Sequence, residues 1–184
     1  GSPAYKVIQA GAKVLGNNKD GIDFSLEDDY YGDTRFHIPF IAWYQVMNAS
    51  LALTTMEVLK DRIPVTMEQL QAGIANTRWQ GRMETILPGV IVDGAHNEDG
   101  VRRFVETAER FQKEYPLTLL FSAVNDKDYQ DMIHTICSRI KFRKVVTTEV
   151  GGYREVPSAE LAEIFCKEGC KDVGNSDNIE EAFH

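Results

Sequence analysis

The sequence predicts an α/β fold in which a mostly parallel sheet carries helices on both faces, preceded by a smaller part made of helices and a β-hairpin. From residue 83 onward, strand-like runs alternate with amphipathic helical runs, and repeated strand–helix units build parallel sheets. Before residue 76 the apolar residues follow mainly the helical period, with two short alternating runs between the helices. These patterns predict one domain over residues 1–76 and a second over residues 77–184.

The first part is expected to contain three helices and two strands. Apolar residues at helical spacing predict a first helix over residues 3–15. Alternation predicts two short antiparallel strands over residues 22–26 and 34–38. A largely apolar run predicts a long, well-buried helix over residues 44–59, and the capping-box sequence Thr-Met-Glu-Gln predicts a helix over residues 66–75.

The second part begins with two strands joined by a Pro-Gly turn and continues with alternating helices and strands. The predicted strands cover residues 83–87, 90–93, 117–123 and 144–148, and the predicted helices cover residues 98–113, 129–140 and 158–167. Residues 171–184 have the pattern of a weak strand and the beginning of a helix. We therefore expect the sheet to lack its last segment.

Composition and charge exclude several classes of protein. The chain has 184 residues, with 20 Lys and Arg, 28 Asp and Glu and a formal net charge of -8, which argues against a nucleic-acid binder. Hydrophobic residues make up 43% and charged residues 26%, close to ordinary globular usage, so disordered and fibrous classes are excluded. No run approaches the roughly 18 apolar residues of a membrane-spanning helix. We expect a soluble protein with no membrane partner.

The cysteines and the first residues bear on location and completeness. Cys137, Cys166 and Cys170 form an odd set without a Cys-x-x-Cys pair, so we expect reduced thiols in a cytoplasmic protein. No basic segment followed by an apolar run opens the chain, so no signal peptide is expected. The chain starts at Gly1 rather than Met, which indicates a piece of a longer protein.

A polar sequence, Asp-Gly-Ala-His-Asn, begins at Asp93, at the end of a predicted buried strand and just before a helix. Ligands of open α/β sheets bind at that edge, and the first amides of the helix favour an anion. Asp93 there can hold a ribose hydroxyl or a metal-bound water, and His96 can donate to a phosphate oxygen. The alternative is that Asp93 or Asn97 only caps the helix.

Two further polar residues are candidates for ligand contacts. Arg82 follows Trp79-Gln80-Gly81 and can grip phosphates with two parallel hydrogen bonds; the alternative is a surface arginine beside a tryptophan packed at a domain seam. Asn48 lies among apolar neighbours near the start of the helix over residues 44–59. A buried amide must find partners, which would be a ligand such as an adenine ring or, alternatively, backbone groups.

Other motifs are weaker. Residues 125–128, Asn-Asp-Lys-Asp, follow a strand and either line the same cleft or cap a helix with solvated charges. The glycines at positions 11 and 16 have phosphate-loop spacing, but asparagines follow where Lys and Ser or Thr are required. We therefore predict no phosphate-binding loop. His37 and His134 have no second ligand at metal spacing, so both are expected to be structural and no metal site is expected.

Four motifs in combination give the chain a family resemblance. They are Tyr44-Gln45-x-x-Asn48-Ala49, Trp79-x-Gly81-Arg82-x-Glu84, Val92-Asp93-Gly94-Ala95-His96-Asn97 and Asp126-Lys127-Asp128. In this order and spacing, the chain resembles folylpolyglutamate synthase/dihydrofolate synthase, of the Mur ligase superfamily. The resemblance runs from about residue 38 to residue 161, and the second and third motifs are specific as a pair.

The resemblance implies a two-domain, monomeric, cytoplasmic parent enzyme. In that family a large N-terminal ATPase domain carries the phosphate-binding loop, the magnesium ligands and a modified lysine, and a smaller Rossmann-like domain follows it. Residues 1–76 would be the end of the ATPase domain, and residues 77–184 would be the Rossmann-like domain without its last segment. The 184-residue chain alone is therefore expected to be inactive.

The resemblance also implies the reaction and the residue roles. ATP, with Mg²⁺, would phosphorylate a folate or dihydropteroate carboxylate, and the amine of L-glutamate would attack the acyl phosphate. Asn48 would contact the adenine side, Arg82 the ribose or phosphates and Asp93 the ribose, and His96 would face the acyl phosphate or the incoming glutamate. Ile41-Ala42-Trp43 replaces the family's glycine-containing turn before Tyr44. The alternative functions are a non-catalytic nucleotide-binding module or a different Mur-type amino-acid ligase.

Overall fold

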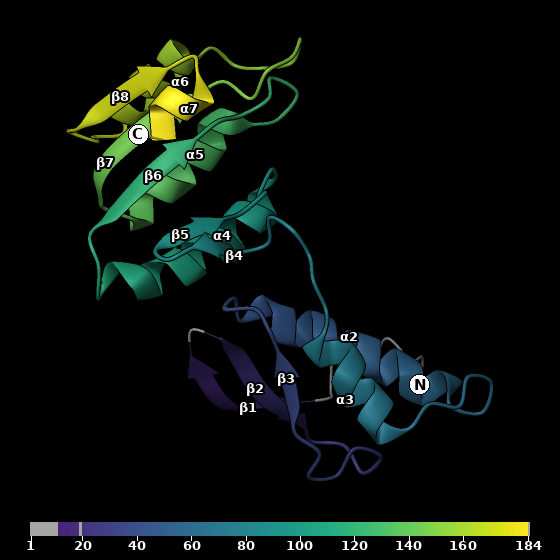
Figure 1. Ribbon diagram of the computed structural model, residues 1–184. Coiled ribbons are helices and arrows are strands. Elements are labelled where there is room, and N and C mark those ends of the chain that lie inside the picture. Colours follow the sequence, from purple (N-terminus) through teal and green to yellow (C-terminus); the bar gives the residue numbers. More distant parts are fainter. Residues whose placement is uncertain (1–10, 19, 184) are drawn as a thin grey trace. The chain divides into compact units, whose positions relative to one another are not determined.

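The computed structural model describes residues 11–18 and 20–183, and the chain divides into two compact units after Asp93 (Figure 1). Each unit has its own hydrophobic core and is described by itself. The expected domain boundary between residues 76 and 77 remains a prediction. Among the described residues, no helix has the length and apolar character needed to span a membrane.

The first unit opens with a three-stranded antiparallel sheet in the order β1-β2-β3. Its strands are β1 (Ala12–Asn18), β2 (Gly21–Leu26) and β3 (Phe36–Ile38). The two predicted strands are thus confirmed. The predicted helix over residues 3–15 is wrong for residues 12–15, which belong to β1, and residues 3–10 lie outside the described residues.

Gly21 is the residue that permits this sheet. Its φ is +147°, and a Cβ atom there would come within 2.2 Å of the carbonyl oxygen of Ile38 in β3. Only glycine can therefore occupy the position where β2 passes close to β3. The inward side chains of β2, Ile22, Phe24 and Leu26, are buried, as their alternation predicts.

Two helices complete the core of the first unit, α2 (Tyr44–Leu59) and α3 (Met67–Ala75). The Thr66 hydroxyl accepts from the backbone N–H of Gln69, and the Gln69 side chain accepts from the N–H of Thr66, so the predicted capping box is confirmed. The expectation that α2 is well buried holds for one face only. Met47, Leu51 and Val58 are between 44% and 49% exposed.

A short antiparallel hairpin ends the first unit. Strand β4 (Glu84–Leu87) pairs with β5 (Val90–Val92) through the Pro88-Gly89 turn, as predicted. Gly89 has a φ of +79°, which a residue with a Cβ atom adopts only at a cost. In the described chain β5 pairs with β4 alone and is partly exposed, so the expectation that Asp93 follows a buried strand is wrong. Asp93 follows β5 directly.

The second unit is built on a parallel sheet in the order β6-β7-β8, flanked by helices (Figure 1), so the α/β prediction is confirmed. Its elements are α4 (Glu98–Gln112), β6 (Leu117–Phe121), α5 (Tyr129–Arg139), β7 (Phe142–Thr148), α6 (Ser158–Lys167), β8 (Val173–Ser176) and α7 (Ile179–Phe183). The largest fully buried side chains of its core include Val101, Val105, Ile133, Ile140, Leu161 and Phe165.

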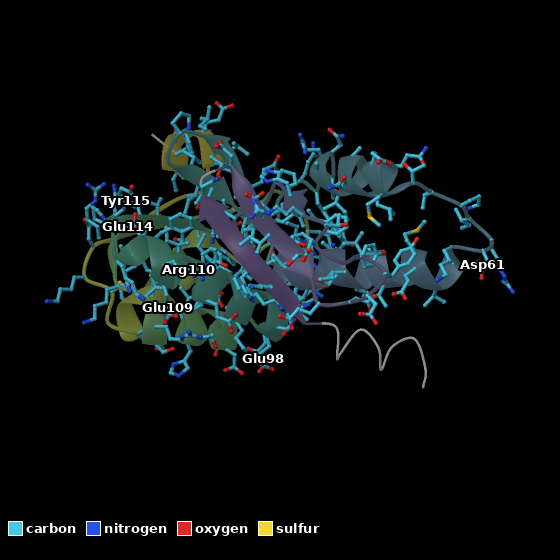
Figure 2. All side chains as sticks on the ribbon, turned by 90° about the horizontal axis from the view of Figure 1, so that it is seen from below. Asp61, Glu98, Glu109, Arg110, Glu114 and Tyr115 are labelled. Atoms are coloured by element: carbon cyan, nitrogen blue, oxygen red, sulfur yellow. The ribbon has the colours of Figure 1, made fainter. Side chains whose placement is uncertain are left out.

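Hydrogen bonds between side chains join the helices of this unit to neighbouring elements. The guanidinium of Arg139 in α5 donates to both carboxylate oxygens of Glu109 in α4; Glu109 is labelled in Figure 2. Ser158, at the start of α6, is fully buried, and its hydroxyl donates to Asp177 after β8 and accepts from Asn175. The start of α6 is thereby fixed to the carboxyl end of β8.

Candidate functional site

The β4–β5 hairpin brings two of the predicted site residues close together. Asp93 follows the end of β5, and its Oδ2 accepts a hydrogen bond of 2.9 Å from the backbone N–H of Met83. Met83 is the neighbour of Arg82 in the chain. The Asp93 carboxylate therefore fixes the backbone of the segment that carries Arg82.

The turn that carries Arg82 has an unusual backbone. Gly81 has a φ of +65° and Met83 a φ of +49°. Met83 is the only non-glycine residue with a positive φ in the described chain. Its side chain is buried, at 3% exposed. A non-glycine residue in this region costs about 1 kcal/mol or more and persists only where its surroundings hold it. The Glu84 carboxylate accepts from the N–H of Gly81 at 2.8 Å, and Asp93 accepts from that of Met83. Two carboxylates therefore stabilise the turn on either side of Arg82.

Arg82 itself is half-buried and presents its guanidinium over an aromatic ring. Its Cζ lies 5.7 Å from the centre of the Trp79 ring, a cation–π geometry that favours a fixed position. No ion pair to Arg82 is found in residues 11–18 and 20–183. The Trp79 side chain is itself 58% exposed, and no carboxylate pairs with the Arg82 guanidinium among the described residues.

His96 is exposed, three residues after Asp93, in the second unit. Its Nδ1 lies 2.8 Å from the carbonyl oxygen of Gly94. Since a carbonyl oxygen only accepts, Nδ1 carries the proton in this contact, and Nε2 is the nitrogen that faces other groups. His96 is thus open to solvent, and Asp93 is partly exposed.

The cap of α4 is made by Asn97, whose Oδ1 accepts from the N–H of Gly100 at 2.8 Å. Asp93 is therefore not used as the helix cap. The first turn carries Glu98, labelled in Figure 2, and Asp99, which form ion pairs with arginines four residues later. A Cβ atom at Gly100 would meet the Asn97 oxygen at 3.1 Å. A glycine at this position lets the loop turn tightly into the helix.

Asn48 differs from its prediction. The side chain is exposed, and its Nδ2 donates to the Oε1 of Gln45 at 2.8 Å. Gln45, only 3% exposed, is the buried amide of this helix. The expectation that Asn48 is buried is wrong because its apolar neighbour Met47 also faces outward. No hydrogen bond of the described chain joins Asn48 to Arg82, Asp93 or His96.

The other candidates have structural partners. Asp128 caps α5 by accepting from the N–H of Asp131, and Asp126 pairs with Arg154 at 3.0 Å, as the capping alternative expects. His37 pairs with Asp23 at 2.8 Å, and His134 pairs with Glu168 at 2.9 Å. No cluster of three or more possible metal ligands occurs within the described part of the chain.

Sequence reasoning did not identify Met83 or Glu84 as parts of the site. The positive φ of Met83 has no signature in its side chain, which is that of an ordinary core residue. Glu84 had a signal, because it is the last residue of the Trp-x-Gly-Arg-x-Glu motif. Its carboxylate explains why an acidic residue stands three positions after Gly81.

Comparison with protein families and with curated proteins gives matches at this site. Residues 81–184 match the family described as Mur ligase, glutamate ligase domain. The chain is 36% identical over 126 residues to the dihydrofolate synthase/folylpolyglutamate synthase of Bacillus subtilis, covering 65% of this chain and 29% of that protein. The chain therefore spans less than a third of that relative's length.

Solved structures share the fold. A folylpolyglutamate synthase of Mycobacterium tuberculosis complexed with ADP and AMPPCP matches with a TM-score of 0.77 and 24% identity, over 92% of this chain and 39% of that chain. A bifunctional folylpolyglutamate synthase/dihydrofolate synthase with Mn, AMPPNP and L-glutamate bound matches with a TM-score of 0.62 and 16% identity, over 90% of this chain and 38% of that one. At these identities the likeness concerns the fold.

Proposed function

The chain belongs to the Mur ligase family, and we propose that it is part of an ATP-dependent ligase that adds L-glutamate to the carboxylate of a folate or dihydropteroate. The family match over residues 81–184 includes both the hairpin with Arg82 and Asp93 and the loop with His96. The Bacillus subtilis relative, at 36% identity, is a dihydrofolate synthase/folylpolyglutamate synthase. The products would be an amide between the acceptor carboxylate and the amine of glutamate, γ-linked when the acceptor is a folate, together with ADP and phosphate.

The observation that supports this proposal most directly is the fixed, carboxylate-free guanidinium of Arg82. Phosphate groups need a cation with several donors in a planar arrangement, and Arg82 supplies one on a turn that Asp93 and Glu84 hold. The residues present therefore fit the phosphates of a nucleotide. When bound, ATP supplies the phosphoryl group that activates the carboxylate, and Mg²⁺ offsets its charge.

Each site residue then has a distinct task. Arg82 would bind the phosphates and stabilise the negative charge that grows there during transfer. Asp93 would hold the turn and contact the ribose, and Asn48 would contact the adenine side. His96 would present Nε2 to the acyl phosphate or to the amine of glutamate. The Mg²⁺ ligands would lie outside this chain, in a monomeric, cytoplasmic parent enzyme of folate metabolism.

A longer parent protein that contains this sequence provides the test. Purified parent, given ATP, Mg²⁺, L-glutamate and dihydropteroate or tetrahydrofolate, should release ADP only when both acceptor and glutamate are present. Mass spectrometry should show the acceptor heavier by one glutamyl residue. The 184-residue chain, which has no phosphate-loop motif, should give neither signal. Nucleotide binding without any glutamyl product in the parent would favour the alternative of a non-catalytic module.

A further inference from the structure

Two of the three cysteines face each other in the second unit. Cys137 lies in α5 and Cys170 follows the end of α6, 33 positions later, with their sulfur atoms 3.7 Å apart. Both side chains are partly buried, whereas Cys166 is exposed. A disulfide bond is about 2.05 Å long, so the sulfurs need to approach by only about 1.7 Å, within reach of small side-chain rotations.

The backbone holds Cys170 in this position. Gly169 has a φ of +93°. Its N–H donates to the carbonyl oxygen of Cys166 at 3.0 Å, and the N–H of Cys170 donates to the carbonyl oxygen of Phe165 at 3.1 Å. These two bonds form a Schellman motif, which fixes the residue after the helix. Phe165 is fully buried, so the motif is anchored in the core.

Cys137 is held as firmly on the facing helix. Its neighbour Ile136 is buried in the core, and His134, one turn earlier, pairs with Glu168 at 2.9 Å. This pair ties α5 to the end of α6 beside the two thiols. The closeness of the sulfurs therefore follows from a helix, α5, and from the turn after α6, both anchored in the core.

We propose that Cys137 and Cys170 form a redox modification site, which a peroxide converts to a disulfide that links α5 to the end of α6. The sulfur of one cysteine attacks a peroxide oxygen and becomes a sulfenic acid, with release of water. The other sulfur then displaces the hydroxyl group, which leaves as a second water with the remaining thiol proton. Two thiols and one hydrogen peroxide thus give one disulfide and two waters. This site is independent of the proposed ligase activity.

The environment of Cys137 makes its thiol slow to react with a peroxide. Burial raises the pKa of the Cys137 thiol well above its ordinary value, and the nearby Cys170 and Glu168 raise it further. Because the thiolate is the reactive form, Cys137 is a slow nucleophile at neutral pH. The 3.7 Å between the sulfurs nevertheless places Cys137 to displace the hydroxyl group of a sulfenic acid on Cys170.

The test uses the folded 184-residue chain and its three cysteines. After treatment with hydrogen peroxide and alkylation of the remaining thiols, the chain should carry one alkyl group, on Cys166, and otherwise weigh two hydrogens less than the reduced chain. A non-reduced peptide map should join the peptides of Cys137 and Cys170. Cys137→Ser and Cys170→Ser should each abolish this cross-link, whereas Cys166→Ser, the matched control, should retain it. Circular dichroism confirms folding of each variant, and Cys137→Ala replaces Cys137→Ser if the hydroxyl disturbs the core.

Oxidation of the chain unfolded in urea provides a second comparison. Without the fold, Cys166 and Cys170 close the shortest loop and should pair in preference. The fraction of cross-link between Cys137 and Cys170 should therefore fall by about tenfold or more relative to the folded chain, since proximity is lost. The proposal is overturned if the folded chain pairs Cys166 instead, or if peroxide oxidises Cys166 to a sulfenic acid while Cys137 and Cys170 stay reduced.

Discussion

Arg82 lies on a turn whose backbone is supported by a carboxylate on each side. The Arg82 guanidinium itself forms no ion pair with a carboxylate in the described chain. Glu84 accepts from the N–H of Gly81 and Asp93 from that of Met83. The acidic residues of the motifs therefore act on the backbone. They position the guanidinium without neutralising it, which leaves it suited to an anion.

Replacing Arg82 by alanine in the longer parent should lower kcat/KM for ATP. The guanidinium would meet phosphates that become more negative during transfer, and loss of such a charge-assisted contact costs about 2 to 4 kcal/mol. Steady-state kinetics measure the effect. Arg78→Ala is the control, because Arg78 donates to the backbone carbonyls of Ala75 and Thr77. An unchanged kcat/KM in Arg82→Ala would contradict the proposed role.

Tyr31 predicts a pH dependence of stability. Its hydroxyl donates to the carbonyl of Leu53 at 2.6 Å, and burial, with smaller effects from Tyr30, Glu57 and Asp28, raises its pKa above the ordinary value. A raised pKa in the folded state means that its contribution is full below the unfolded pKa of about 10. The contribution is lost as the pH rises from there through the folded value.

The Tyr31→Phe variant should be less stable than the natural chain by about 1 kcal/mol at neutral pH, and the difference should shrink above about pH 10. Urea unfolding of both proteins at pH values from neutral to alkaline measures it. Tyr115→Phe serves as the control, since Tyr115 is 59% exposed and its replacement should change little at any pH. A difference that stays constant into the alkaline range would contradict the assignment.

The functional roles of Arg82, Asp93, His96 and Asn48 stay predictions, and the sequence could anticipate only part of their surroundings. Polar residues after a strand and before a helix often cap the helix, as Asn97 and Asp128 do. His96 is exposed and Asp93 is partly exposed, which leaves both side chains accessible to a ligand. The burial of Asn48 was predicted wrongly, since apolar neighbours indicate burial only when the helix covers them on that side. The positive φ of Met83 could not be predicted from the sequence, because it depends on a contact with Asp93 ten residues later.

At the scale of elements, glycines at two helices should respond in opposite ways to the same replacement. Gly169 ends α6 with a φ of +93°, and Gly73 lies inside α3; neither has an atom within 4 Å of an added Cβ. Gly169→Ala should destabilise the protein by about 1 to 2 kcal/mol, the cost of a Cβ atom in the left-handed region. Gly73→Ala should stabilise it by about 0.5 to 1 kcal/mol. Chemical unfolding measures both, and a neutral Gly169→Ala would contradict the Schellman assignment.

Helices were easier to predict than the strand β1. The capping box at Thr66 and the periodic runs of α2, α5 and α6 are local signals, so their bounds are close to those predicted. In β1, the pattern of Ala12 and Val14 fits a helix as well as a strand. Pairing with β2 makes this segment a strand. The sequence does hold one sign of this pairing, because Asp20-Gly21 before an alternating run is a hairpin signal.

At the scale of the whole molecule, the two cores should respond separately to substitution. Leu53 belongs to the core of the first unit and Leu161 to that of the second, and both are buried. Either leucine replaced by alanine should cost about 2 to 5 kcal/mol. Hydrogen exchange should show lost protection in the substituted unit first, so each variant controls for the other. Equal loss in both units would show that they unfold as one.

The strand order β6-β7-β8 also bears on how this chain is made. Each strand of the parallel sheet pairs with its neighbour in sequence, and one helix, α5 or α6, lies in each connection. A chain that leaves the ribosome from its N-terminus can complete the β6–α5–β7 unit before Val173, the first residue of β8, has been synthesised. Every new strand then meets an edge that already exists, so the nascent sheet never has to open to admit a later one.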